Sequence, residues 1–223
     1  MTNARKAKPR LGRPPATDSA DTRRRILDIA RVAFAERGFD AATNRSLGLE
    51  VGITAGALYH YFGSKLELYV AVHDDVQERV YDRFAAAVLE ATTFRDQINA
   101  VLDVSHELNK EDPSLAQFLG SVRVDMRRNP ELEAALRDAA VARQGFFDEI
   151  VARGVETGEI AAADRARVSA LVLTLLVGLT DGVSGSVTTQ MMAIGAIKSL
   201  LDGTLIRGVT PDRRRSRRGG QEL

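Results

Sequence analysis

Residues 43–65 bring together side chains that can form hydrogen bonds and ion pairs with a nucleic acid. Arg45 carries the two-pronged guanidinium that suits a guanine edge, and the hydroxyl groups of Thr54 and Tyr59 are secondary candidates. Residues 55–57 are very small, so the backbone could approach base edges closely while offering only methyl contacts, for example to thymine. The chemistry that this segment favours is recognition of DNA in a groove.

A turn at Gly52 would hold these side chains in place. Glycine can adopt the left-handed conformation that ends a helix, Ile53 can enter the core, and the Thr54 hydroxyl can cap the next helix. Two short helices joined in this way, with Leu58 buried, form a helix-turn-helix, whose second helix enters the major groove of DNA. Residues 43–62 therefore predict a DNA-binding unit.

A preceding helix is expected to pack across this unit. Between Asp21 and Gly38 the apolar residues recur one turn apart, which is the pattern of an amphipathic helix that ends at Gly38. These residues are Ile26, Leu27, Ala30, Ala33 and Phe34. Further along, Ser64 and Glu67 have the spacing of a capping box, which predicts that a long helix begins at Lys65.

The remainder of the chain predicts helices only. No strand alternation or internal repeat occurs, and prolines and glycines stand where helices start and stop. The expected helices span about 65–91, 94–110, 113–128, 130–157, 163–184 and 187–207. The predicted fold class is all-α, with an N-terminal three-helix unit and a larger C-terminal helical domain.

The last two expected helices are unusually apolar. Apolar residues fall on nearly all sides of 163–184 and 187–207, so these helices need cover on two sides. An interface between two subunits would supply the second cover, and a single intramolecular core is the alternative. We expect a homodimer formed through these two helices.

Charge is divided unevenly along the chain. The formal net charge is +1, yet residues 1–65 hold 12 Lys and Arg against 6 Asp and Glu, and residues 66–206 hold 13 against 22. Residues 207–223 are basic again, with 6 against 2. This division indicates that the N-terminal part meets a polyanion, whereas a chance spread of solvated charges is the alternative.

Composition also limits the classes of site and location. The chain has no cysteine, which excludes disulfides, thiolate zinc sites and cysteine nucleophiles and is compatible with a reducing cytoplasm. No apolar run follows the first residues, so no secretory signal is expected, and the apolar stretch at 170–179 is too short to span a bilayer. The expected location is cytoplasmic, without membrane contact.

Five short segments together resemble the DNA-binding domain of the TetR/AcrR family of bacterial transcriptional repressors. They are RILDIA at 25–30, FAERGF at 34–39, VGIT at 51–54, LYHYF at 58–62 and SK at 64–65. Their order and spacing match over roughly residues 22–73, and the rest of the chain is similar to the family only in length and helical character. One departure is Gly48, where the family commonly has alanine; glycine should weaken that helix by roughly 0.5–1 kcal/mol.

The resemblance implies a homodimer in which the last two long helices of each subunit form a four-helix interface. It also implies a ligand cavity in the body and a ligand-driven shift of the helix at 65–91 that changes the separation of the two reading heads. The expected divisions are a flexible basic arm at 1–20, a helix-turn-helix DNA-binding domain at 21–64, a ligand-binding and dimerisation domain at 65–207, and a disordered basic tail at 208–223.

The expected DNA contacts combine base readers with phosphate contacts. They are Thr43, Arg45, Thr54, Ala55, Gly56, Ala57, Tyr59, His60 and Lys65, together with Arg10 and Arg13 of the arm. By resemblance, Thr43, Tyr59, His60 and Lys65 would hold phosphates. Partial burial of Tyr59 and His60 against the first helix is the alternative. Arg10 and Arg13 lie within residues 8–15, a segment similar to an AT-hook, which binds a narrow minor groove; a disordered basic leader is the alternative.

Polar residues on the otherwise apolar helices of the body are the candidate ligand contacts. They are Asn99, His106, Asn109, Gln117, Arg123, Gln144 and Thr174. A cavity with aliphatic walls and a few such groups suits a largely apolar small molecule. Arg123 is the candidate anchor for an anionic group, and pairing with Asp125 or another carboxylate is the alternative. For each of the others, exposure or an internal hydrogen bond is the alternative.

Catalysis finds little support in the sequence. The histidines are dispersed, residues 73–75 lack the spacing of two metal ligands on one helix face, and no phosphate loop or nucleophile elbow occurs. We therefore expect no enzymatic activity, no metal and no cofactor. The expected function is a ligand-responsive homodimeric repressor that an apolar small molecule releases from a palindromic DNA operator. An architectural DNA-binding protein without a ligand is the alternative, and a helical enzyme acting on an apolar substrate is a third.

Overall fold

The protein is helical throughout the part that the structure describes. The computed structural model describes residues 16–183 and 186–205, and no strand occurs within these ranges. The elements are α1 (Ala16–Ala41), α2 (Asn44–Val51), α3 (Ala55–Tyr61), α4 (Lys65–Leu89), α5 (Phe94–Glu111), α6 (Pro113–Arg128), α7 (Pro130–Ala135), α8 (Arg137–Glu156), the 3₁₀ turn η1 (Ala162–Asp164), α9 (Arg165–Val183) and α10 (Val187–Leu201). The prediction of an all-α fold is confirmed.

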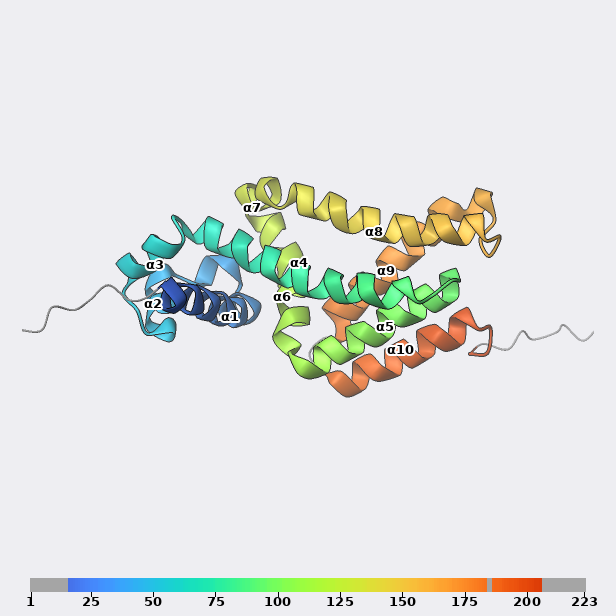
Figure 1. Cartoon of the computed structure of the whole chain (residues 1–223), viewed down its shortest axis with the longest axis horizontal. Coiled ribbons are helices and arrows are strands. Elements are labelled where there is room, and N and C mark those ends of the chain that lie inside the picture. The colour runs from blue at the N-terminus through green and yellow to red at the C-terminus, as the bar shows by residue number, and fades with distance from the viewer. Residues whose placement is uncertain (1–15, 184–185, 206–223) are drawn as a thin grey trace, which may run out of the picture.

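Helices α1, α2 and α3 form a small head at one end of the molecule (Figure 1). The apolar stripe of α1 faces inward, with Ile26, Ala30 and Phe34 fully covered. Leu47 of α2 and Leu58 of α3 complete this core, and each is at most 2% exposed. Because burial takes up one side of these short helices, their other side is left facing solvent.

Helix α4 runs out of the head and along the body (Figure 1). Ser64 caps it by accepting a hydrogen bond from the Glu67 backbone N–H at 3.0 Å. The Glu67 carboxylate reaches back one residue further than in a standard capping box and accepts from the Gly63 N–H at 3.0 Å. The predicted cap thus forms, and it fixes the direction in which α4 leaves the head.

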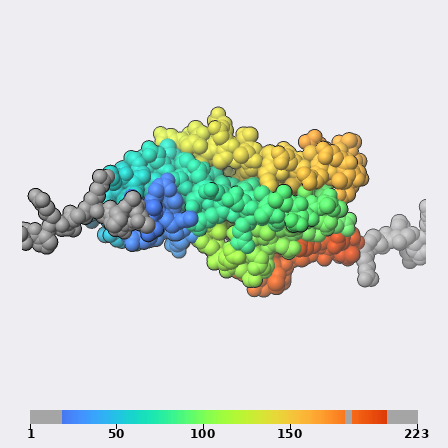
Figure 2. All heavy atoms as spheres, viewed as in Figure 1, coloured from blue at the N-terminus to red at the C-terminus, as the bar shows by residue number. Residues whose placement is uncertain are grey.

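The body consists of the far half of α4 and helices α5 to α10. Helix α5 packs against α4, α6, α8 and α10, while α9 packs against α6, α8 and α10. Side chains of α4 and α5 cover much of the near face of the body in Figure 2. Aromatic rings join α4 to α8, where Tyr81 meets Phe146 with ring centroids 5.3 Å apart.

Helix α6 crosses the middle of the molecule and contacts both head and body (Figure 1). It packs closely on α1 and, further along, on α9. At the α1 contact, Phe118 of α6 meets Tyr69 of α4 with ring centroids 5.2 Å apart, and Tyr69 meets Phe34 of α1 at 4.8 Å. This aromatic cluster ties three helices together where the head ends.

Three predicted boundaries are wrong. The helix expected at 130–157 is two helices, because Leu136 leaves the helical conformation at φ −100° and ψ 5° while its side chain is buried. Helix α10 ends at Leu201, before Gly203 with its φ of 68°, rather than at residue 207. Helix α1 begins at Ala16, inside the expected arm, because alanine and acidic residues favour a helix start even without an apolar stripe. The predicted tail at 208–223 lies outside the described residues.

Candidate DNA-binding surface and ligand cavity

Helices α2 and α3 meet at the turn predicted from the sequence. Thr43 caps α2 by accepting a hydrogen bond from Ser46 N–H at 3.1 Å, and the Ser46 hydroxyl accepts one from Thr43 N–H at 3.1 Å. At the other end, Gly52 has φ 79° and ψ 30°, and Ile53 N–H donates to the Gly48 carbonyl at 2.8 Å. Hydrogen bonds therefore close both ends of this short helix.

Gly48 has a packing role that the sequence alone did not reveal. It is buried, and a Cβ atom at this position would lie 3.0 Å from the Ile53 carbonyl oxygen and 3.3 Å from Ala55 N. The departure from the family's usual alanine therefore accompanies a close approach of α2 to the turn. Leu49, beside it, is 74% exposed, and nothing in the structure explains this.

Replacing Gly52 by alanine should lower the free energy of unfolding by about 1–2 kcal/mol, because a residue with a Cβ is strained at a left-handed φ. No atom lies within 4 Å of the added methyl, so crowding adds nothing to this cost. Gly145→Ala is the matched control: Gly145 lies within α8 in equally open surroundings, and alanine there should stabilise by about 0.5–1 kcal/mol. Urea unfolding followed by circular dichroism measures both; shifts in the same direction would contradict this account.

Helix α3 presents its polar side to solvent. Thr54 caps it by accepting a hydrogen bond from Ala57 N–H at 3.1 Å, and Leu58 anchors it in the core. Tyr59 is 51% exposed and His60 is exposed, so neither is buried against α1. Ala55, Gly56 and Ala57 form the first turn of the helix. The small side chains leave the first turn of α3 open to a close approach by a ligand.

The other residues expected to contact DNA differ in whether their side chains already have partners within the protein. Arg45 is exposed on α2 and forms no ion pair within the described residues. The Thr43 hydroxyl is already engaged in capping α2. Arg10 and Arg13 lie outside the residues that the structure describes. Arg45, Tyr59 and His60 thus remain the side chains most available for contact.

Lys65 is engaged within the protein. Its ammonium group donates to the Phe39 carbonyl at 2.7 Å and lies 4.1 Å from the centre of the Phe39 ring. Burial lowers the pKa of Lys65 below its ordinary value, and the nearby charges of Asp40 and Asp125 oppose this. The side chain expected to hold a phosphate therefore also joins the start of α4 to the end of α1.

A buried carboxylate joins the head to the body. Asp125 of α6 is 4% exposed, and its Oδ2 accepts hydrogen bonds from Phe39 N–H at 3.0 Å and from the Tyr69 hydroxyl at 2.9 Å. Gly38 makes this contact possible: its φ of 74° and ψ of 174° suit glycine, and a Cβ atom would lie 2.9 Å from Asp125 Oδ1. Burial and the neighbouring Asp125 charge raise the pKa of Tyr69 well above its ordinary value. A movement of α6 would thus be transmitted to both α1 and α4 through these hydrogen bonds.

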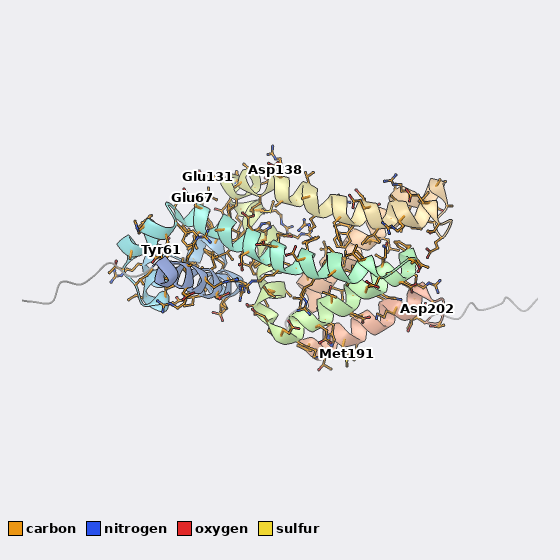
Figure 3. All side chains as sticks on the ribbon, in the orientation of Figure 1. Tyr61, Glu67, Glu131, Asp138, Met191 and Asp202 are labelled. Atoms are coloured by element: carbon orange, nitrogen blue, oxygen red, sulfur yellow. The ribbon has the colours of Figure 1, made fainter. Side chains whose placement is uncertain are left out.

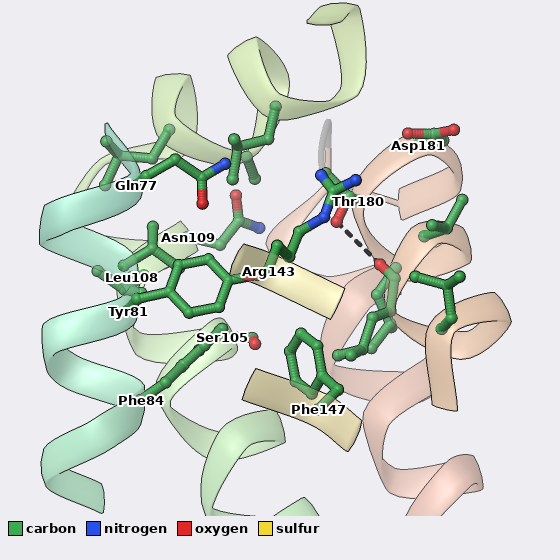
Figure 4. A pocket seen from close by; sticks show the side chains of 18 of the residues that line it. Gln77, Tyr81, Phe84, Ser105, Leu108, Asn109, Arg143, Phe147, Thr180 and Asp181 are labelled. Carbon is green, nitrogen blue, oxygen red and sulfur yellow. Dashed lines mark hydrogen bonds between the residues drawn. The ribbon is translucent and has the colours of Figure 1, made fainter. Parts of the chain in front are cut away.

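A cavity opens in the body between α4, α5, α6, α8, α9 and α10 (Figure 4). The cavity has a volume of about 110 Å³. Its walls are largely apolar and include Tyr81, Phe84 and Phe147. The polar side chains in the wall are Gln77, Ser105, Asn109, Arg123, Arg143, Thr180, Asp181 and Gln190. An apolar pocket with a few polar groups is the usual form of a small-molecule site.

Of the seven expected ligand contacts, only Asn109 and Arg123 lie in this wall. The ion-pair partner of Arg123 is Asp181, at 3.6 Å, rather than Asp125. Gln117 and Thr174 are exposed, and Gln144 donates to Asp148 at 3.2 Å. Asn99 and His106 are partly buried, each with one side-chain atom that lacks a hydrogen-bond partner, but neither lines the cavity. The polar residues predicted from the sequence therefore lie on helices that line the cavity, but most of their side chains do not face it.

Sequence reasoning missed Gln77, Tyr81 and Arg143. Gln77 and Tyr81 are one turn apart on α4, and Phe84 follows on the same side, so a stripe of polar and aromatic residues runs along the cavity side of that helix. Arg143 and Phe147 have the same spacing on α8. These i, i+4 pairs were the available signal, although it does not distinguish a cavity wall from an ordinary helix contact.

Comparisons with known proteins agree with this geometry. Residues 26–72, which cover most of the head and the start of α4, match the family model described as "Bacterial regulatory proteins, tetR family". Residues 26–72 therefore form a TetR-family DNA-binding domain. The transcriptional regulator UidR of Escherichia coli K12 is 28% identical over 178 residues, covering 79% of this chain and 87% of UidR. The transcriptional repressor AcnR of Corynebacterium glutamicum is 29% identical over 192 residues, covering 83% and 93%.

A solved structure extends the likeness through the body of the chain. AibR, in complex with isovaleryl coenzyme A and operator DNA, superposes with a TM-score of 0.67, at 14% sequence identity, over 80% of this chain and 97% of AibR. At this identity the match shows the fold alone. The relatives are transcriptional regulators, so this chain is a DNA-binding regulator rather than an enzyme.

The described residues contain neither a cluster of metal-ligand side chains nor a helix suited to crossing a membrane. No cluster of three or more His, Asp or Glu positioned to hold a metal ion occurs in residues 16–183 or 186–205. His73 is buried, its Nε2 lies 3.1 Å from Gln77 Nε2, and burial lowers the pKa of His73. None of the described helices has the length and apolar character needed to cross a membrane.

Proposed function

We propose that this chain is a homodimeric repressor that binds a palindromic operator through two α2–α3 units and leaves it when a small molecule occupies the cavity. The observation that carries the proposal is the double role of α6. Arg123 of this helix lines the cavity, while Asp125, half a turn away, holds Phe39 of α1 and Tyr69 of α4. A ligand that shifts α6 would thereby change the orientation of the head.

The homodimer is supported by apolar side chains left uncovered on α9 and α10. Leu171, Met191, Met192 and Leu200 are between 46% and 61% exposed. Figure 3 shows Met191 at the edge of the molecule, pointing away from the body. Several exposed apolar side chains on two neighbouring helices are typical of a protein interface. Two heads in fixed relation would read two half-sites.

Repression and ligand binding are supported by likenesses to known proteins. AcnR is named a transcriptional repressor, and AibR was solved with both an acyl coenzyme A and operator DNA. The cavity of this chain supports ligand binding independently of these likenesses, because its apolar walls carry only a few polar groups.

The direct test selects binding sites from random DNA with the full-length protein and then footprints the selected sequence. The proposal expects one short inverted repeat, protected symmetrically, and an added cavity ligand should weaken its binding by about 5-fold to 150-fold. Coating that grows with DNA length, without a preferred sequence, would instead indicate an architectural DNA-binding protein.

Arg45→Ala should weaken binding to the selected operator by about 1–3 kcal/mol, or roughly 5-fold to 150-fold, because the exposed guanidinium is the best-placed group for a guanine edge. The loss should be smaller for random DNA, where only phosphate contacts act. Fluorescence anisotropy at two salt concentrations measures both. Arg153→Ala, an exposed arginine of α8 in the body, is the control and should leave operator affinity unchanged. An equal loss on operator and random DNA would assign Arg45 to the phosphates instead.

A further inference from the structure

Positive charge in the cavity wall is not balanced by the protein. Arg123 and Arg143 both line the cavity, and Asp181 is the one carboxylate among the residues that form its wall. Asp181 lies 3.6 Å from Arg123 and is therefore paired with it. Arg143 forms neither an ion pair nor a hydrogen bond with the residues that the structure describes. The wall thus presents a guanidinium without a counter-ion.

Aromatic side chains form part of the surroundings of Arg143. The residue lies among aromatic side chains from α4 and α8, with Tyr81 and Phe147 beside it (Figure 4). The rings of Tyr81 and Phe147 have centroids 6.2 Å apart. Burial raises the pKa of Tyr81, and the charge of Arg143 opposes that rise. A half-buried guanidinium loses hydration in such a setting, and a carboxylate that accepts two parallel hydrogen bonds would compensate.

A second polar group in the wall also lacks a partner. Asn109 is 1% exposed; its amide nitrogen donates to Gln190 Oε1 at 3.0 Å, while its Oδ1 has no hydrogen-bond partner. Exchanging the oxygen and nitrogen positions of both amides would keep the bond between them and leave an N–H group unpaired instead. A hydroxyl group satisfies either arrangement because it both donates and accepts.

The rest of the cavity wall is largely apolar. Phe84, Leu108 and Leu176 contribute to the wall, and Asn109 and Arg143 come from different helices, α5 and α8. Aromatic walls favour a flat ring, which they can contact face to edge. The limited free space favours a compact molecule over a long chain.

We infer that the cavity takes a small carboxylic acid that carries an apolar ring and a hydroxyl group, with the carboxylate on Arg143 and the hydroxyl on Asn109. This inference rests on the proposed ligand role of the cavity and adds the chemical class of the ligand. It differs from the largely apolar molecule that the sequence predicts in requiring two polar ends.

Calorimetric titration of the full-length protein tests the inference with 3-(4-hydroxyphenyl)propanoate as the probe. The primary amide of the same acid lacks the negative charge, and 3-phenylpropanoate lacks the hydroxyl. We expect the probe to bind about 10-fold more tightly than its amide, because hydrogen bonds to a charged group are the stronger ones. We expect a smaller loss, about 3-fold to 10-fold, when the hydroxyl is absent.

Variants assign these preferences to residues. Arg143→Gln should bring the affinity for the acid down to that for the amide, and Asn109→Leu should remove the preference for the hydroxyl. Arg153→Gln, an exposed arginine on the same helix, is the matched control and should change neither preference. Circular dichroism of each variant distinguishes a loss of binding from a loss of folding. If Asn109→Leu does not fold, Arg143→Gln alone still tests the contact with the carboxylate.

Three results would overturn the inference: equal affinity for acid and amide, an acid preference that persists in Arg143→Gln, or no binding of the acid at millimolar concentration. The titration contains no DNA, so it is independent of the proposed repressor function. An acid that binds through Arg143 without weakening operator binding would contradict the proposed function alone. A neutral molecule that occupies the cavity and releases DNA, while the acid does not bind, would contradict only the ligand class.

Discussion

Replacing Asp125 by alanine is expected to lower the free energy of unfolding by about 2–5 kcal/mol. The substitution leaves the part-buried Phe39 N–H and the buried Tyr69 hydroxyl without their acceptor, and each unpaired buried donor costs about 1–3 kcal/mol. For a chain of this size the melting temperature should fall by roughly 5–15 °C. Thermal unfolding followed by circular dichroism measures the change, and Asp82→Ala on the exposed side of α4 is the control, with an expected shift within about 0.5 kcal/mol.

The same carboxylate is expected to carry coupling between cavity and head. Tyr69→Phe removes only one donor of the pair and should cost about 1 kcal/mol, so this variant remains folded. If α6 acts through Asp125, a cavity ligand should change operator affinity less in Tyr69→Phe than in the wild type. Normal stability of Asp125→Ala would contradict the structural account, and an unchanged ligand effect in Tyr69→Phe would contradict the coupling.

The head could be predicted from the sequence because the interactions that define its helix ends are local. Gly52, Thr54 and Ser64 each act on atoms within a few residues, through a left-handed turn or a helix cap, and the structure contains all three. The stripe on α1 needed only the helical period. The same local rules failed at Leu136, where burial of a leucine, rather than a proline or glycine, marks a break between two helices.

The cavity could not be predicted because it depends on how distant helices face one another. Asn109, Arg123 and Arg143 come from α5, α6 and α8, and no spacing within one helix shows that their side chains share a space. Asp125 illustrates the same limit. Its nearness in sequence to Arg123 favoured an ion pair, yet these residues point to different regions, with Arg123 next to Asp181 and Asp125 next to Phe39.

The placement of Gly38 explains why one carboxylate can serve two helices. The helical conformation of α1 is interrupted there, and the backbone turns so that the next N–H points at Asp125. Any side chain at residue 38 would enter the space of Asp125 Oδ1. The end of α1, the first turns of α4 and the last turn of α6 therefore form a single hydrogen-bonded unit beside the candidate DNA-binding surface.

The second large effect is expected from Met192→Glu on α10. Met192 is 61% exposed in the single chain, so a charge there costs the isolated subunit little. Within the proposed interface, however, the carboxylate would lose its hydration without gaining a partner. The dimer should dissociate at micromolar concentration, and affinity for a palindromic operator should fall by about 10²-fold to 10⁴-fold, because each head would then bind its half-site alone.

Analytical ultracentrifugation and operator titration together measure this result. Val141→Glu is the matched control, because Val141 is 67% exposed on α8, outside the two helices of the proposed interface. This variant should remain dimeric with full operator affinity. Melting curves of both variants confirm that each subunit stays folded. A Met192→Glu protein that remains a dimer with unchanged operator affinity would place the interface elsewhere, and the uncovered side chains of α9 and α10 would then need a different partner.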